Sequence, residues 1–505
     1  MYKTLWRLLI VLVHLHQERE NAACTNAPNT HSHIMPEHDC KLKVKHEHEH
    51  ASARNSVAWE PVEARAQILG LLQSAQKSIS LSTWILADNP FSREMVRIMK
   101  DRVERAGVRV TIVCFGGILP RVTGLLSRIG VQISEGPPMR LKGTRGFTVH
   151  EYVHDLVLGN HEKILVIDAS VVLFSDRNLG DHYYGEHWTY TGLDVLVRGD
   201  ESLAKYVDDH ITSALSRNYL YVPSGLAIGA PSKKTSTTST TSTNDRAGSG
   251  RCDCASAAAA TVATTSFRVK APNADTDHIT GAYLRVLANV EAGSEVAVVN
   301  TVFLPLLCVR QALAKALREK QIQLTIVVDN VDELTKDVSV SASRDAAAGH
   351  VRYLLDAVRS VRNKRIQTLG QCSASNCCSG FSSGVSAHRT TGSDPVLPTV
   401  RLMGFNQRKR SLHSKYLLTS STVLFGSYNM DFYSQHQEVE YVIESTDGAL
   451  RDTLWAYTRN ILLPDCVPVL ISAPCSCVGL SAAKVTSNCS VCFWHSLSQM
   501  CPCYF

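Results

Sequence analysis

The chain has 505 residues, of which 44% are hydrophobic and 19% charged, so it can bury one large core or two medium ones and is not disordered throughout. With 7% aromatic residues, 29 glycines and 17 prolines, the composition also excludes a collagen-like chain. Lysine and arginine outnumber aspartate and glutamate by 52 to 46, a net charge of +6. This mild excess suits anionic lipid or nucleic acid as a partner without choosing between them.

Residues 1–56 are predicted to form a leader. The apolar run at 8–13 is far shorter than the roughly 20 residues of a membrane span, and two basic residues precede it with no acid before Glu18. Signal peptides, short anchors and mitochondrial presequences share this pattern. The His-rich stretch 31–50 is either a weak metal chelator or a solvated polar segment.

Residues 466–505 are predicted to form a Cys-rich tail, because they hold seven of the 16 cysteines. Their spacings match no regular zinc module. The cysteines are therefore zinc ligands, acylation sites or reduced and unpaired thiols.

Two biased segments divide the rest of the chain. Residues 230–267 are rich in Thr, Ser and Ala with almost no bulky apolar side chains, which predicts a low-complexity linker. The Ser-, Gly- and Cys-rich tract 371–395 predicts a loop insertion. The remaining stretches, 57–229 and 268–465, each have an ordinary domain size.

These two units repeat one pattern of elements. Each contains a strand, an amphipathic helix and a buried strand at nearly the same spacing: 79–86, 92–105 and 108–115 in the first, and 295–302, 306–319 and 322–328 in the second. Alternation of strand, helix and strand indicates a sheet with helices on its faces. The parsimonious architecture is a duplicated α/β unit.

Each unit also contains one His-x-Lys tripeptide, His161 with Lys163 and His413 with Lys415, and the sequence has no others. On an extended strand, residues two apart point to the same face, so each pair would project together. An imidazole can attack phosphorus, a lysine and an asparagine amide can stabilise phosphoryl charge, and a second imidazole can protonate the leaving alkoxide. Two facing half-sites would make one phosphodiester-cleaving site that uses no metal ion.

The two segments resemble the paired H-x-K-x4-D-x6-G-S-x-N (HKD) motifs of the phospholipase D superfamily, and the likeness covers about 57–465. It implies an α/β fold of two phospholipase D-like repeats, each a mixed sheet flanked by helices in an α/β/α sandwich. It also implies a pseudo-twofold relation between the repeats and one shared active site. The segments Arg177–Gly185 and Leu193–Gly199 look most like those of bacterial-type cardiolipin synthases.

The resemblance also implies the site residues. The catalytic set is His161, Lys163, Asp168, His413 and Lys415, and the set that binds phosphate or orients other groups is Asn178, Ser427, Asn429, Asp194 and Glu440. Asp194 and Glu440 are the candidates for orienting the imidazoles across the interface. We expect His161 to be the nucleophile, because its motif keeps Asp168, and His413 to be the acid and base. No metal ion or cofactor is expected.

Both motifs depart from the family pattern. The Gly-Ser of the first is replaced by Ser175-Asp176, which puts a carboxylate near a phosphate site and is expected to weaken anion binding. In the second, Ser420 takes the Asp position and the spacing to Gly426 is one residue short. Whatever orients the second imidazole must therefore come from elsewhere.

The resemblance implies a phosphatidyltransferase of cardiolipin synthase type that works through a phosphohistidine. Two alternatives stay open: a hydrolytic phospholipase D, phosphodiesterase or nuclease, and a non-enzymatic lipid-binding member. The expected partners are phosphatidylglycerol or a related phospholipid and a membrane surface, without nucleic acid. The Thr/Ser and Ala tracts suggest a eukaryotic source, which would place the protein at the mitochondrial inner membrane.

Overall fold

The computed structural model describes the residues 55–115, 139, 141, 143–152, 159–185, 190–213, 265–270, 278–329, 338–375, 397–407, 410–431, 434–435 and 438–469. All of them belong to one compact unit, 50–222 and 251–505. The predicted leader up to residue 54, most of the linker and most of the Cys-rich tail lie outside the described residues. None of the described helices is both long enough and apolar enough to cross a membrane.

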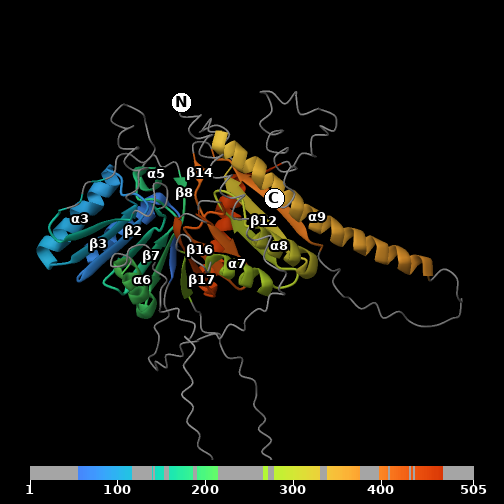
Figure 1. The fold of residues 1–505 in the computed structure, drawn as a ribbon, viewed down its shortest axis with the longest axis horizontal. Coiled ribbons are helices and arrows are strands. Elements are labelled where there is room, and N and C mark those ends of the chain that lie inside the picture. The colour runs from blue at the N-terminus through green and yellow to red at the C-terminus, as the bar shows by residue number, and fades with distance from the viewer. Residues whose placement is uncertain are drawn as a thin grey trace, which may run out of the picture. The chain divides into compact units, whose positions relative to one another are not determined.

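The first repeat contains a seven-stranded sheet in the order β1-β9-β7-β6-β2-β3-β4 (Figure 1). The strands are β1 Ser56–Ala58, β2 Ser78–Thr83, β3 Arg109–Phe115, β4 Phe147–Tyr152, β6 Ile164–Ile167, β7 Val171–Ser175 and β9 Asp194–Arg198. Strands β2, β3 and β4 run parallel, and the other neighbours are antiparallel.

Helices cover both faces of this sheet: α2 Pro61–Ser74, α3 Pro90–Ala106, the single turn α5 Asp181–Tyr184 and α6 Glu201–Ser213. Helix α3 begins where the Asn89 side chain accepts from the backbone N–H of Ser92, and it ends at Gly107, whose φ of +66° suits glycine. Alternate residues of a strand face opposite sides. Leu165 of β6 therefore packs with α2 and α3, while Val166 packs with α6.

The second repeat has the same sheet topology. Its strands run β10-β17-β16-β15-β11-β12-β13-β18, with parallel pairs β11–β12 and β12–β13 and antiparallel pairs elsewhere. They are β10 Thr265–Lys270, β11 Glu295–Val299, β12 Gln323–Asp329, β13 Thr399–Phe405, β15 Tyr416–Leu418, β16 Val423–Gly426, β17 Glu438–Ser445 and β18 Cys466–Pro468. The first seven match the first sheet strand for strand, with β18 added at the edge. The pseudo-twofold relation stays a prediction.

Helices also flank the second sheet: α7 His278–Asn289, α8 Leu307–Lys315, α9 Val338–Ser375 and α11 Gly448–Tyr457 (Figure 1). Helices α7, α8 and α9 share one core cluster with β11 and β12, and α11 packs on the other face. The core cluster that contains α11 also includes residues of the first sheet. The Phe174 ring lies 5.5 Å from that of Tyr441 and 5.7 Å from that of Phe267. The predicted α/β fold of helix-flanked mixed sheets is confirmed.

Three described elements extend into the segments assigned to the linker, the loop insertion and the tail. The linker was expected to reach 267, but β10 begins at Thr265, because pairing with β17 orders these residues. The loop insertion was expected from 371, whereas α9 continues to Ser375. The tail was expected from 466, yet β18 pairs with β13 at the edge of the second sheet.

Candidate active site

The two His-x-Lys segments enter the site through reciprocal pairings between the repeats. Strand β5, Gly159–Asn160, runs parallel to β17 of the second repeat, and the N–H of His161 donates to the carbonyl of Val439 at 3.0 Å. Conversely, β14, Ser411–Leu412, pairs with β8, Tyr190–Thr191, of the first repeat, and the N–H of His413 donates to the carbonyl of Thr191 at 3.0 Å. Each histidine is therefore held by the repeat to which it does not belong.

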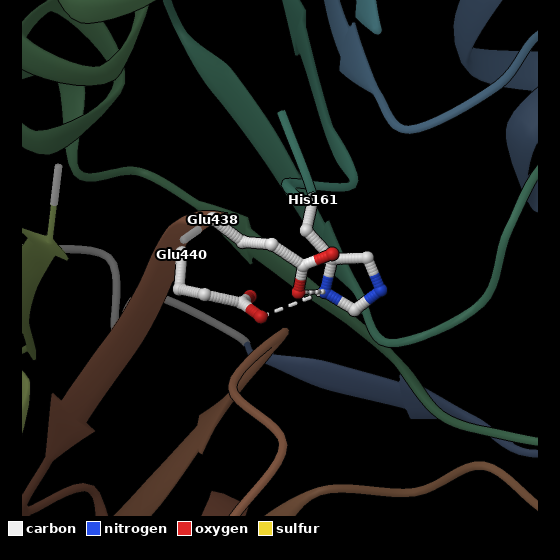
Figure 2. Close-up of side chains that lie close together, drawn as sticks. All are labelled: His161, Glu438 and Glu440. Atoms are coloured by element: carbon white, nitrogen blue, oxygen red, sulfur yellow. Dashed lines mark hydrogen bonds and ion pairs between the residues drawn. The ribbon is translucent and has the colours of Figure 1, made fainter. Parts of the chain in front are cut away.

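A carboxylate of the second repeat orients His161. Its Nδ1 lies 2.8 Å from Oε1 of Glu440 and 3.7 Å from Oε2 of Glu438. Figure 2 shows the imidazole beside both carboxylates, which extend from strand β17. Glu440 also accepts from the hydroxyls of Ser427 and Ser434. An ionised Glu440 can only accept, so in that form the carboxylate holds the proton on Nδ1 and leaves the lone pair on Nε2.

A backbone carbonyl orients His413 instead of a carboxylate. Its Nδ1 lies 2.6 Å from the carbonyl oxygen of Asp176, and a carbonyl can only accept. Nδ1 is therefore the donor, and Nε2 of this ring also keeps its lone pair. The sequence left this orienting group unidentified because a backbone carbonyl has no signature in a motif.

The two lysines lie beside their own histidines. Lys163 Nζ donates to the carbonyl of His161 at 2.6 Å, and Lys415 Nζ donates to the carbonyl of His413 at 2.5 Å. Lys415 also reaches Thr301 Oγ1 at 3.3 Å. Both ammonium groups are thus fixed next to the rings, where they could neutralise phosphoryl oxygens.

Burial and shared positive charge keep both imidazoles neutral. Burial lowers the pKa of His161 to about 3, and the charges of Lys163 and Lys415 act in the same direction. Burial followed by Lys415 and Lys163 also holds the pKa of His413 well below its usual range. The same two cations act on both rings, which indicates one shared site, and each Nε2 is available as a base or nucleophile.

The carboxyl groups shift the opposite way. Burial raises the pKa of Glu440 to about 8 and that of Glu438 to about 7. The charge of Lys163 and the hydroxyls of Ser427 and Ser434 oppose this shift at Glu440. Lys163 and the two hydroxyls thus favour the carboxylate that accepts from Nδ1, whereas burial favours the protonated carboxyl.

Asp168, predicted to be catalytic, lies outside this group of side chains. It follows β6, at the opposite end of the strand from Lys163, and its carboxylate accepts backbone N–H groups of Gln76, Lys77 and Ser78 at 2.6–3.1 Å. Its contacts fix the turn after β6 and reach neither imidazole. Ser420, which takes the Asp position in the second motif, likewise lies in the turn after β15, so its departure does not remove a group that contacts His413.

Asp194 is also placed differently from its predicted role. Its Oδ1 accepts from the hydroxyls of Ser175 and Tyr184, and its Oδ2 lies 3.9 Å from Nη1 of Arg177. These are bonds within the first repeat, and none involves a histidine. Among the described contacts, Glu440 is the carboxylate that orients an imidazole across the interface.

The two asparagines occupy matching positions after β7 and β16. Asn178 Nδ2 donates to the hydroxyl of Tyr183 at 3.2 Å, and the Tyr183 ring lies edge-on to His413 at 5.2 Å. The segment around Asn429 is held by Asn300, which donates to the carbonyl of Tyr428 and accepts from the N–H of Met430. The contact through Tyr183 places Asn178 near His413, and Asn300 fixes the backbone on either side of Asn429.

Sequence reasoning missed several groups around the rings. Glu438 is two residues before Glu440 on one strand, so the period of two could have indicated it. Trp84 lies 6.1 Å from the His161 ring, and Tyr190 lies 6.0 Å from the His413 ring. These aromatic walls come from loops and short strands of the first repeat, for which the motif spacing contains no signal.

One group of side chains could hold a metal ion. Ligand atoms of His161, Glu438 and Glu440 all lie within 4.8 Å of one another (Figure 2). The cation Lys163 opposes a divalent ion there, and coordination through Nδ1 would move the imidazole proton to Nε2. A metal ion on these atoms would therefore remove the lone pair that the hydrogen bond to Glu440 exposes.

Solved structures show which known fold this arrangement matches. The chain is similar to a phosphatidylserine synthase from Haemophilus influenzae Rd KW20, with a TM-score of 0.51, 12% sequence identity and coverage of 82% of this chain and 87% of that chain. The chain has a phospholipase D-like fold. The predicted fold is thereby confirmed, and membership of the superfamily stays a prediction.

Other comparisons are more distant. A polyphosphate kinase from Porphyromonas gingivalis gives a TM-score of 0.40 at 9% identity, covering 80% of this chain and 49% of that chain. A phospholipase D family member, Nuc from Salmonella typhimurium, gives 0.26 at 18% identity, covering 33% of this chain and 99% of that chain. No protein-family model matches the chain, and no curated protein matches it.

Proposed function

We propose that this protein is a phosphatidyltransferase of cardiolipin synthase type that works through a phosphohistidine. The observation that carries the proposal is the pair of histidines whose Nδ1 atoms are both bonded to acceptors, His161 to Glu440 and His413 to the carbonyl of Asp176. Each Nε2 is left with a lone pair. One ring can then attack phosphorus while the other exchanges protons with the departing and incoming hydroxyls.

The carboxylate on His161 makes that ring the proposed nucleophile. An imidazole that bonds to phosphorus becomes positively charged, and Glu440 at 2.8 Å stabilises this charge. The neutral carbonyl bound to His413 offers less stabilisation to a covalent adduct. This contact takes the place of the reason first drawn from Asp168, whose carboxylate is used in a backbone turn.

The reaction proceeds in two displacements. Nε2 of His161 bonds to phosphorus as the bond from phosphorus to the leaving alcohol oxygen breaks, and protonated His413 gives the alkoxide its proton. The bound phosphodiester anion opposes the effect of burial and of the two lysines on the pKa of His413, which favours its protonated form in the complex. The incoming lipid hydroxyl then bonds to phosphorus, returns a proton to His413 and breaks the phosphorus–nitrogen bond. Lys163 and Lys415 neutralise the phosphoryl oxygens throughout.

Purified full-length protein with phosphatidylglycerol vesicles tests the proposal. Transfer between two phosphatidylglycerol molecules gives cardiolipin and glycerol, which mass spectrometry resolves, and His161→Ala gives neither. Phosphatidic acid as the lipid product would replace the transferase with the hydrolytic alternative. No product and no covalent adduct with any phospholipid tested would favour a non-enzymatic lipid-binding protein.

Membrane association, at the mitochondrial inner membrane if the source is eukaryotic, is part of the same proposal. Its support is the lipid substrate proposed above and the basic, acid-poor sequence before Glu18. Fractionation of cells expressing the full chain tests it, and recovery in a fraction free of membranes would contradict it.

A further inference from the structure

The matching topology of the two sheets lets equivalent positions be compared, and each repeat has its buried carboxylate at a different one of them. In the second repeat, the N–H of Ser427 donates to the carbonyl of Tyr441 at 3.1 Å, and in the first, the N–H of Asp176 donates to the carbonyl of Leu193 at 3.2 Å. Asp176 therefore stands where the second repeat has Ser427. Counting back one residue from each accepting carbonyl, Gly192 stands where the second repeat has Glu440.

The exchange is sterically complementary. A Cβ atom at Gly192 would lie 2.4 Å from Oδ1 of Asp176 and 2.4 Å from Cγ of Arg177, far closer than van der Waals contact allows. The Asp176 side chain fills the space that a larger residue at 192 would need. Each repeat thus places one carboxylate at this junction, Glu440 from the strand in one and Asp176 from the motif in the other.

The Asp176 carboxyl is buried and only partly used by the backbone. The residue is 0% exposed, Oδ1 accepts from the N–H of Leu193 at 2.8 Å, and Oδ2 has no hydrogen-bond partner among the described residues. Its backbone carbonyl holds His413 at 2.6 Å, and Lys415 Nζ lies 3.0 Å from the same Nδ1. A buried charge is retained only with a partner. The described ion pairs within 4 Å do not include this carboxyl, and Lys415, which contacts the same imidazole, is the cation whose charge acts on it most strongly.

We propose that Asp176 is the first repeat's counterpart of Glu440, a positioning residue whose carboxylate holds Lys415 charged beside His413. The motif comparison predicted that Asp176 would weaken anion binding. In this proposal, Asp176 instead keeps Lys415 charged, and Lys415 binds the anion. This role deepens the proposed phosphatidyl transfer and rests on it, but the charge pairing itself is measurable without turnover.

The electrostatics agree with this pairing. Burial lowers the pKa of Lys415 to about 7 and raises that of Asp176 to about 7, and each charge opposes the effect of burial on the other. The other charged groups that act on the two are Lys163, Glu440, Asp431, Arg177 and Asp194. Without the carboxylate, Lys415 would lose its proton at a lower pH.

A double-mutant cycle on stability at pH 7 tests the pairing. Asp176→Asn keeps an acceptor for the Leu193 N–H but removes the charge, and Lys415→Met removes the cation. We expect Asp176→Asn to raise the unfolding equilibrium constant in wild-type protein by about tenfold more than in the Lys415→Met background. Equal effects in the two backgrounds would overturn the proposal. Glu444→Gln is the control, because Glu444 pairs with Arg268 and Arg285 instead, and its effect should be additive with Lys415→Met.

The pH profile of transfer gives the second readout. Asp176→Asn should move the alkaline limb of kcat/KM to lower pH, because Lys415 then loses its proton more easily, whereas the control Glu444→Gln should leave that limb in place. The stability measurements could show coupling while the alkaline limb of kcat/KM stays in place in Asp176→Asn. The two residues would then form a charge pair that does not serve the reaction, and the positioning role would be wrong. If wild-type protein transfers no phosphatidyl group, the proposed function fails, while the stability cycle still decides the pairing.

Discussion

Nδ1 of His161 in the first repeat lies 2.8 Å from Oε1 of Glu440 in the second. This side-chain hydrogen bond joins the two halves at the proposed nucleophile, beside the backbone bond from His161 to Val439. It also fixes the imidazole tautomer, since the carboxylate accepts the Nδ1 proton and leaves Nε2 unprotonated.

Glu440→Gln should lower kcat by about 10²-fold or more, because the amide can still accept from Nδ1 but cannot neutralise a phosphorylated imidazole. Phosphatidyl transfer by purified variants measures this. Glu444→Gln is the matched control. Glu444 lies on the same strand but pairs with Arg268 and Arg285, so its loss should leave kcat within a few-fold of wild type. Similar losses in both variants would point to general damage to β17.

Alanine substitutions of the two histidines should affect different steps of the reaction. His413→Ala should slow breakdown of the intermediate and trap radiolabelled phosphatidyl on the protein, since the second step needs a base for the incoming hydroxyl. His161→Ala should retain no label. Label on His161→Ala and none on His413→Ala would reverse the assignment and keep the covalent mechanism.

Glu438→Gln should stabilise the protein, and more at pH 8 than at pH 5. Burial raises the folded-state pKa of Glu438 to about 7 from an ordinary 4.5, so the folded protein binds a proton that the unfolded chain releases between these values. The free energy of unfolding of the wild type therefore falls as pH rises through that window. The glutamine variant has no group there to titrate, so its stability does not fall for this reason. Urea unfolding at both pH values measures it. A larger gain at pH 5 would contradict the sign.

Asp168→Ala should lower stability without changing the chemistry of the folded protein. The carboxylate accepts several backbone N–H groups in the turn before β2, and losing a charged acceptor costs roughly 1.5–3 kcal/mol. Urea unfolding and kcat per folded molecule separate the two effects. A loss of kcat by 10²-fold or more in fully folded variant would restore the catalytic role predicted for Asp168.

Chelation should leave transfer unchanged, because Lys163, Lys415 and the two asparagines can supply the charge and donors that a metal ion would. Added Zn²⁺ should inhibit, since coordination by His161, Glu438 and Glu440 would put the imidazole proton on Nε2. Assays with EDTA and then with Zn²⁺ measure both. Loss of activity in EDTA with recovery in Mg²⁺ or Zn²⁺ would show that the lysines and asparagines are not sufficient.

The sequence alone predicted the helix-flanked α/β sheets and singled out the two His-x-Lys tripeptides. Apolar strands and amphipathic helices recur at equal spacing in both halves, and hydrophobic periodicity is a local property that the chain displays without tertiary information. The two His-x-Lys tripeptides, for the same reason, needed only the period of two on an extended strand.

The tertiary structure alone decided how these residues are used. Asp168 and Asp194 have the right chemistry and lie near the motifs in sequence, but the fold directs one to a backbone turn and the other to Ser175 and Tyr184. The orienting groups come from the other repeat, Glu440 for His161 and the carbonyl of Asp176 for His413. Contacts between residues more than 200 positions apart arise only when the two sheets pack together, so no local pattern contains them.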